Sequence, residues 1–299
     1  MIFFSLVTLN IIVCICDSTA MRLLHISGNP WGDDPLDISL CEFLGSDVPP
    51  YMILSHRWRE EEVLFPNMTG PDRTSVMQKK GYTKLETSCK IALQQGLQYA
   101  WIDTCCIDKS SSAELSEAIN SMYNYYAQAQ VCYAYLDDVN LDVLQNENSL
   151  DGCAWFSRGW TLQELIAPRE MYFYSAQWRS MGSKSSMCRH ISVTSGIDEK
   201  VLKDPVMLNR VCVSEKMSWA AQRTTTRPED EAYSLMGLFG VNLPPLYGEG
   251  RQKSFRRLQL EIMHTSTDHT LFAWHSNIST GDMLAPTVQH FKYRAGFKT

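Results

Sequence analysis

One glutamate in this chain stands among residue types that could carry out chemistry. Glu164 lies three residues after Thr161 and four after Trp160, within the stretch 157–165. Two interpretations fit this spacing. In a capping box, Thr161 caps a helix and Glu164 reaches back to the free backbone N–H at the helix start. In the alternative, Glu164 is a catalytic carboxylate held at a helix start, on the rim of a nucleotide pocket.

A single carboxylate beside an aromatic wall suits one reaction class well. Cleavage of the bond between ribose and nicotinamide expels a group that is already positively charged, so it needs no general acid, unlike ordinary glycoside hydrolysis. Glu164 would stabilise the oxocarbenium-like transition state, and Trp160 would form part of the pocket wall. The sequence lacks a Gly-x-Gly-x-x-Gly loop, a Walker A loop, a Gly-x-Ser-x-Gly elbow and a His-Glu-x-x-His motif.

Apolar runs predict the strands that must position this stretch. Residues 51–56, 99–108 and 131–136 are short, nearly continuous apolar runs that end in polar residues, which is typical of buried parallel strands. Helical spacing at 83–98, and again after residue 110, separates these runs. The alternation of strands and helices indicates an α/β fold with a parallel sheet flanked by helices.

Ligands of such sheets bind beyond the carboxyl ends of the strands. The side chains expected at that edge are Ser55, His56, Arg57 and Asp103, with Trp58 directly after the strand and Trp160 one connection later in the chain. Asp108, Asp137 and Asp138 are expected near the same edge. For the acids, solvation of a strand end is the alternative to ligand binding. For Arg57 and Arg158, an ordinary ion pair is the alternative to a phosphate clamp.

The flanking segments are predicted to differ in kind. Residues 21–50 mix Gly, Pro and Asp with short apolar pieces, which predicts an irregular entry segment. Residues 171–174 are predicted to form a further strand. Beyond residue 175, helical patterns at 217–221, 227–240 and 250–264 indicate a mostly helical extension.

Composition limits the class of protein. The 299 residues are 44% hydrophobic and 20% charged, as in an ordinary globular protein. The net charge of −6 argues against a nucleic-acid partner, which usually requires a basic excess. Ten cysteines without a Cys-x-x-Cys pair indicate a reduced, cytoplasmic chain, and no metal site is expected.

Residues 1–20 leave a second localisation open. They are apolar without a basic start, and Met21 begins a segment that reads as a natural domain start. Both a weak signal peptide, which would direct the chain to the secretory pathway, and a spurious upstream extension fit this pattern. At the other end, the abrupt tail after Phe291 is interpreted as a truncated continuation.

Four stretches together resemble the fungal heterokaryon-incompatibility (HET) domain. These stretches are 51–58, 81–85, 99–108 and 157–165. The resemblance covers 21–175, and the segment 223–262 is similar to the one that commonly follows this domain. The predicted organisation is therefore a signal-like or spurious extension at 1–20, a HET domain at 21–175 and a helical extension at 176–299.

The resemblance implies a role in non-self recognition and regulated cell death in filamentous fungi. HET domains are regarded as distant relatives of TIR domains, so it also implies a flavodoxin-like fold. Some TIR domains hydrolyse NAD with a glutamate in a Trp-Cys-x-x-Glu-Leu stretch, and 160–165 is similar to it, with Thr161 where cysteine is usual. By the same analogy, Ser55, His56, Arg57 and Trp58 would border the nucleotide. Other TIR domains are scaffolds without activity.

Two functional hypotheses follow from the resemblance. The first is a cell-death effector that hydrolyses NAD through Glu164, with NAD as a substrate and no cofactor required. The second is a non-enzymatic module that acts by self-association or by docking another fungal signalling protein. Whether the chain is an enzyme is left open by its sequence.

Overall fold

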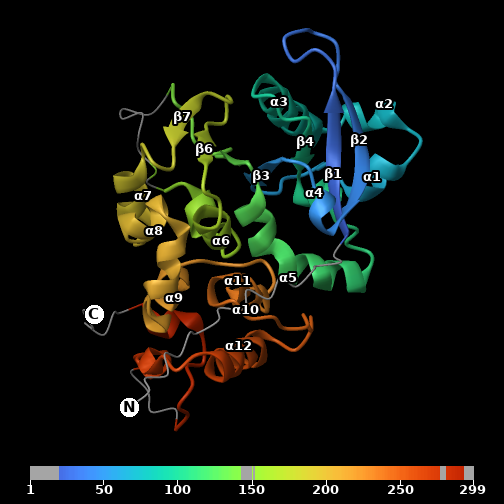
Figure 1. Ribbon diagram of the computed structural model, residues 1–299. Helices are drawn as coiled ribbons and strands as arrows, with labels where there is room; N and C mark the ends of the chain where they lie inside the picture. The colour runs from blue at the N-terminus through green and yellow to red at the C-terminus, as the bar shows by residue number, and fades with distance from the viewer. Residues whose placement is uncertain (1–19, 143–149, 151, 277–280, 293–299) are drawn as a thin grey trace, which may run out of the picture.

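The predicted apolar runs form the centre of one mixed sheet. The computed structural model describes residues 20–142, 150, 152–276 and 281–292. Its sheet has seven strands in the order β2-β1-β4-β3-β5-β6-β7 (Figure 1). The strands are β1 (Ala20–Ser27), β2 (Asp37–Leu44), β3 (Met52–His56), β4 (Tyr99–Trp101), β5 (Val131–Tyr135), β6 (Met171–Tyr174) and β7 (Ser180–Ser183). Residues 1–19 of the signal-like segment, and the tail beyond residue 292, lie outside the described residues.

The four central strands, β4, β3, β5 and β6, are parallel. All five residues of β3 are buried, because both faces of a central parallel strand are covered. The three outer strands pair antiparallel with their neighbours, β1 with both β2 and β4, and β7 with β6. The α/β class is therefore confirmed, but the sheet is mixed rather than wholly parallel. It also extends beyond residue 175, to the end of β7.

Two local predictions were wrong. The segment 21–50 is not irregular, because β1 and β2 form a regular antiparallel pair. Six of its eleven Gly, Pro and Asp residues lie in the loop 28–36 between these strands, and four follow β2. The strand predicted at 99–108 ends at Trp101. Asp103–Cys106 is instead a helical turn, α4, in which the carbonyl of Ile102 accepts hydrogen bonds from the N–H groups of Cys105 and Cys106.

Helices connect and cover the strands. Those before residue 170 are α1 (Phe65–Thr69), α2 (Arg73–Met77), α3 (Lys80–Gln94), α4 (Asp103–Cys106), α5 (Ser112–Gln128) and α6 (Thr161–Ile166). Those after it are α7 (Cys188–Ser195), α8 (Glu199–Lys203), α9 (Val213–Ala220), α10 (Asp230–Tyr233), α11 (Met236–Phe239) and α12 (Arg251–Thr265). Within the described residues, no helix is long and apolar enough to cross a membrane.

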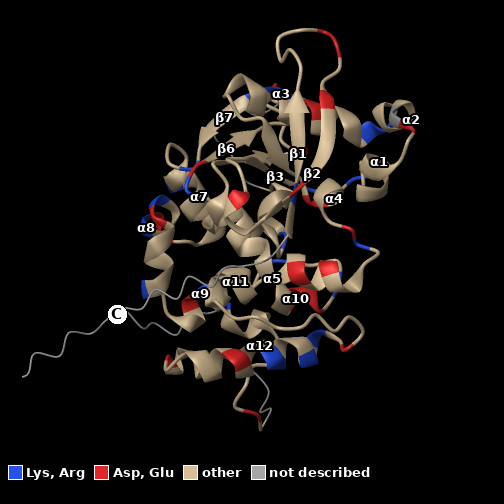
Figure 2. Cartoon of the chain, turned by 45° about the vertical axis from the view of Figure 1, so that its right-hand side comes forward, with Lys and Arg blue, Asp and Glu red and all other residues tan. Residues whose placement is uncertain are grey.

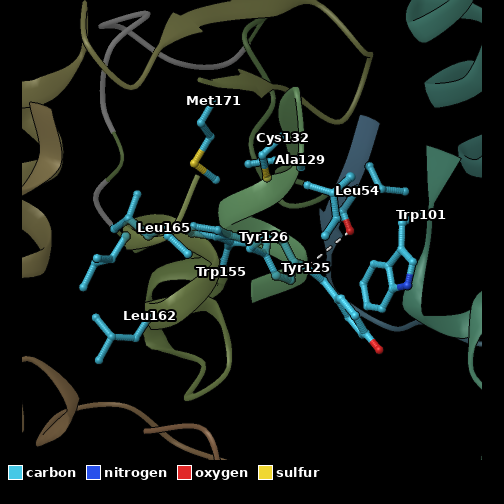
Figure 3. Close-up of a cluster of buried hydrophobic side chains, with 14 of the residues drawn as sticks. Leu54, Trp101, Tyr125, Tyr126, Ala129, Cys132, Trp155, Leu162, Leu165 and Met171 are labelled. Carbon is cyan, nitrogen blue, oxygen red and sulfur yellow. Dashed lines mark hydrogen bonds between the residues drawn. The ribbon is translucent and has the colours of Figure 1, made fainter. Parts of the chain in front are cut away.

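Helices α5 and α6 contact each other and share a buried cluster with β3, β5 and β6 (Figure 3). Leu162 and Leu165 of α6 are fully buried. In the same cluster the Tyr126 hydroxyl donates to the Leu54 carbonyl over 3.4 Å. This packing fixes α6, and with it Glu164, against the carboxyl end of β3.

The helical extension packs on α5. Helices α9 to α12 lie together on the side of α5 away from the sheet (Figure 1), and α11 contacts α5. A Cβ built on Gly237 would lie 2.2 Å from the Tyr123 Cβ, so only glycine permits this approach of the two helices. The Asn120 side chain bonds both the N–H and the carbonyl of Leu243, each at 3.1 Å. The extension is thereby joined to the sheet layer along α5.

Basic residues gather on α12 (Figure 2), where they are exposed or half-buried. Arg251, Arg256 and Arg257 form ion pairs with Glu231, Asp282 and Glu249 respectively. Because three of the four Lys and Arg side chains of α12 are paired in this way, the helix offers little free charge to a polyanion.

Candidate functional site

A cavity of about 290 Å³ lies where the carboxyl ends of β3 and β4 meet the extension. This volume is near the lower end of the range for small-molecule sites, roughly 300–1,000 Å³. The sheet layer contributes to its wall His56, Trp58, Asp103, Lys109, Tyr126, Arg158, Trp160 and Glu164, and the extension contributes Thr224, Thr225, Thr226, Arg227, Asp230 and Tyr247.

One wall is the apolar face of α5. Leu115, Ile119, Met122 and Tyr126 follow the spacing i, i+4, i+7, i+11 and all line the cavity. Residues at this spacing share one face of a helix. This stripe gives the cavity an apolar side opposite its charged groups.

Glu164 lies in the first turn of α6 and is buried, with 9% exposure. The capping-box interpretation is wrong. Trp160 occupies the cap position, and its side chain makes no capping hydrogen bond to the helix start. The Thr161 hydroxyl instead donates to the carbonyl of Trp155 over 2.6 Å. The Glu164 carboxylate accepts a hydrogen bond of 2.5 Å from the Ser55 hydroxyl.

A chain of buried donors positions this carboxylate. The Trp155 indole Nε1 donates to the Ser55 Oγ over 2.9 Å, and the Ser55 hydroxyl donates onward to Glu164. Trp155 and Ser55 are both fully buried. Because the Trp155 N–H donates to a lone pair of the Ser55 oxygen, the hydroxyl proton of Ser55 points toward Glu164. Ser55 therefore lies behind Glu164 rather than on the cavity wall.

Burial raises the pKa of Glu164 to about 7, and the nearby carboxylate of Asp103 adds to this rise. The hydrogen bond from Ser55, the charge of Arg158 and a hydrogen bond from Tyr126 oppose it. Within the described residues, no lysine, arginine or histidine lies within salt-bridge distance of this carboxylate. A carboxylate with so raised a pKa in a cavity is typical of a functional site.

His56 is a neutral side chain on the same wall. Burial, reinforced by the charge of Lys84, lowers its pKa to about 3. Its Nε2 lies 3.9 Å from Asp103 Oδ1, but an uncharged imidazole at that distance forms neither an ion pair nor a hydrogen bond. Neither ring nitrogen has a partner among the described residues. Both nitrogens are themselves buried, so the imidazole contributes an uncharged surface to the cavity wall.

Asp103, Trp58 and Lys109 form a charged group at the cavity. The Trp58 Nε1 donates to Asp103 over 2.8 Å, and Lys109 Nζ lies 3.5 Å from the same carboxylate and 3.5 Å from the Trp58 ring centroid. Burial alone would raise the pKa of Asp103, but Lys109 and these hydrogen bonds hold it below its ordinary value. This acid is accordingly ionised and already partnered.

The predicted site residues are mostly brought together. His56, Trp58, Asp103, Trp160 and Glu164 line one cavity. Arg57 does not line it; its guanidinium lies 2.8 Å from Asp138 and 3.4 Å from Asp137. Asp108, also expected near this edge, accepts instead from the hydroxyl and N–H of Ser110. Within the described residues, no group of three or more His, Cys, Asp or Glu side chains could hold a metal ion.

The wall supplied by the extension was not predicted. Asp230 accepts a hydrogen bond of 2.9 Å from the Tyr247 hydroxyl and another from the Trp160 indole. Burial raises the pKa of Asp230, against the effect of both hydrogen bonds and of Arg227. The sequence marks 227–233 as an acidic helix start, and nothing in its pattern shows that these acids are buried.

Comparison with known proteins finds a family whose model matches part of this chain. The family model "Heterokaryon incompatibility protein (HET)" matches residues 51–151. The chain is 44% identical over 223 residues to "Vegetative incompatibility protein HET-E-1" of Podospora anserina. That match covers 72% of this chain and 16% of the relative, so the chain spans about a sixth of that protein's length. No solved structure matches the chain.

Proposed function

Because this chain carries a heterokaryon-incompatibility domain, we propose that it acts in fungal vegetative incompatibility as a cell-death effector that hydrolyses NAD at the nicotinamide–ribose bond. The relative from Podospora anserina is named for vegetative incompatibility, and it supports the cellular role. The proposed chemistry is carried by one observation. Glu164 is a buried carboxylate at the cavity wall, held by Ser55, and no cation of the described residues lies within 4.0 Å of it.

The strand order supports a TIR-like fold. Numbered along the chain, the four parallel strands stand in the order 2-1-3-4, which is the order of the flavodoxin-like doubly wound sheet. In that fold ligands bind beyond the carboxyl ends of the strands, beside the point where the order reverses. His56 ends β3, one of the two strands at which the order reverses here, and it lines the cavity.

The proposed reaction needs few groups from the protein. The C–N bond between ribose and nicotinamide breaks, and its electron pair leaves with nicotinamide, which departs neutral. Ionised Glu164 stabilises the positive charge that develops on the ribose. Water then adds to the ribose carbon and loses a proton, giving ADP-ribose. The carboxylate can accept that proton, because its pKa of about 7 is close to the working pH.

The neighbouring residues have supporting roles in this reaction. Trp58, Trp160 and the apolar face of α5 form walls that exclude water from the ribose. Neutral His56 adds no positive charge near the developing cation. Ser55 holds Glu164 in place and favours its ionised form.

Nicotinamide release by the purified chain tests the proposal. We expect the wild type to release nicotinamide from NAD, and Glu164→Gln to abolish the release while the protein melts as a folded protein. Glu170→Gln is the matched control, because Glu170 is exposed and outside the cavity. No release at high protein concentration, even after forced oligomerisation, would reject the enzymatic proposal.

A cell-death assay separates this proposal from a non-enzymatic signalling module. Expression of the chain in a filamentous fungus is expected to be toxic, and Glu164→Gln is expected to remove the toxicity. Full toxicity of a folded Glu164→Gln variant would instead favour action by self-association or partner docking.

A further inference from the structure

A segment of the extension is hydrogen-bonded to the loop before Glu164. The Thr224 N–H donates to the Ser157 carbonyl over 2.7 Å, and the Gly159 N–H donates to the Thr224 carbonyl over 2.8 Å. Arg158 and Thr224 thus pair as an isolated parallel bridge. A Cβ built on Gly159 would lie 2.4 Å from the Thr225 Cγ2. Arg158 therefore sits directly beside residues 224–227 on the cavity rim.

The buried side chain of Arg223 also links the extension to the loop before α6. Its Nη1 donates to the Arg158 carbonyl over 2.9 Å and to the Thr161 Oγ1 over 3.0 Å, and its Nε donates to the Trp219 carbonyl over 3.2 Å. One side chain of the extension thereby fixes both the rim at Arg158 and the first residue of α6.

Among the described residues, three cations line the cavity, and two of these form no ion pair with an acid. Lys109 is held by Asp103 and the Trp58 ring. For Arg158 and Arg227, no carboxylate of the described residues lies within 4.0 Å. The Arg227 guanidinium lies 4.1 Å from the Tyr247 ring centroid. Stacking on a ring occupies the face of a guanidinium and leaves its N–H edges free.

The acids of the cavity form no ion pair with these two arginines, although Arg158 and Arg227 act through their charge on the pKa values of Glu164 and Asp230 respectively. Asp103 is paired with Lys109, and Asp230 accepts from Tyr247 and Trp160. Glu164 is held by Ser55, on the side of the cavity formed by the sheet layer. Other surface arginines, such as Arg57 and Arg256, are each paired with an aspartate. The rim formed by Arg158 and Arg227 therefore carries positive charge that is free to bind an anion.

We propose that Arg158 and Arg227 form an anion subsite that holds the diphosphate of a nucleotide. Arg158 comes from the loop before α6, and Arg227 comes from the segment of the extension that is hydrogen-bonded to that loop. Arginine presents its N–H groups in a planar fork that matches phosphate oxygens. The subsite rests on the proposed function in one respect, namely that the occupant is a nucleotide whose ribose reaches Glu164. The apolar face of α5 then receives the uncharged part of that nucleotide.

Binding of ADP, with adenosine and inorganic pyrophosphate as comparison probes, tests the subsite by calorimetry on the full chain. We expect ADP to bind at least tenfold more tightly than either probe, because ADP alone carries both the diphosphate and the nucleoside. Arg158→Gln and Arg227→Gln should each weaken ADP binding by about 10- to 100-fold, the range for loss of hydrogen bonds between charged groups. Adenosine binding should stay unchanged in both.

Arg256→Gln is the matched control, because Arg256 is exposed and paired with Asp282 outside the cavity; it should bind ADP as the wild type does. Equal affinity for ADP and adenosine in the wild type, or ADP binding unaffected by both cavity substitutions, would overturn the proposal. Pyrophosphate binding as tight as ADP binding would also overturn it, since a site for free phosphate would then explain the data.

The same titrations distinguish failure of the subsite from failure of the proposed reaction. ADP binding that depends on both arginines, in a chain that releases no nicotinamide, would leave the subsite standing and reject the reaction. Nicotinamide release with unchanged KM for NAD in both arginine variants would do the opposite.

Discussion

Replacing Glu164 by glutamine is expected to stabilise the protein at alkaline pH. The carboxyl is buried and its pKa is about 7, against an ordinary value of 4.5. A pKa raised by folding means that the folded state favours the protonated acid. The contribution of this group to stability is therefore fully present below pH 4.5 and is lost as pH rises through 7. The interval between the two pKa values corresponds to roughly 3 kcal/mol at pH 8.

The pH dependence isolates this effect from the other consequences of the substitution. At pH 5 the same linkage costs the wild type only about 1 kcal/mol. The glutamine amide can still accept the hydrogen bond from Ser55, and any cost of its unpaired N–H groups is the same at both pH values. The stability of Glu164→Gln relative to wild type should consequently improve by roughly 2 to 3 kcal/mol between pH 5 and pH 8.

Urea unfolding at pH 5 and pH 8 measures this difference. Glu170→Gln serves as the control, and its stability relative to wild type should not change between the two pH values. A Glu164→Gln variant whose stability relative to wild type is the same at both pH values, or falls toward pH 8, would show that folding does not raise the pKa of this carboxyl. The reasoning about its burial would then be wrong.

Three further outcomes are expected. The kcat/KM for nicotinamide release should rise with pH through about 7, because the ionised form of Glu164 is the active one; a flat or falling profile between pH 6 and 8 would count against this role. Ser55→Ala removes a hydrogen bond that favours the ionised carboxylate, so the midpoint of that profile should move to higher pH; an unmoved midpoint would contradict the assignment. Gly159→Ala places a Cβ against Thr225 and should lower the melting temperature by several degrees, as overpacking of about 1–3 kcal/mol does in a chain of this size; an unchanged melt would mean that the contact relaxes freely.

The sequence was informative where local pattern decides structure. The continuous apolar runs at 51–56 and 131–136 form β3 and β5. A strand that is buried on both faces has apolar residues at nearly every position, and such a run is visible in the sequence. The periodic residues of α5 became a cavity wall, because helical spacing places them on one face whatever they contact. The polar residues at the ends of β3 and β4 met at one edge, as parallel strands require.

The sequence was uninformative where the partner of a side chain lies far away along the chain. Arg57 and Arg158 are indistinguishable by their neighbours in sequence, yet Arg57 meets Asp137 and Asp138 while Arg158 faces the cavity. Thr161 and Glu164 have capping-box spacing, but Ser55, more than one hundred positions earlier, binds the carboxylate. The pairing of Thr224 with 157–159 is equally non-local, and so the contribution of the extension to the site was missed.

Three parts of the chain surround Glu164, and the family model matches only one of them. The matched region ends at residue 151, before α6 begins. The carboxylate is bound by Ser55 from β3, carried by α6, and enclosed by residues of the extension. Because Arg223 bonds both Arg158 and Thr161, movement of the extension would shift the start of α6. The extension is therefore a structural part of the site, because it lines the cavity and holds the start of the helix that carries Glu164.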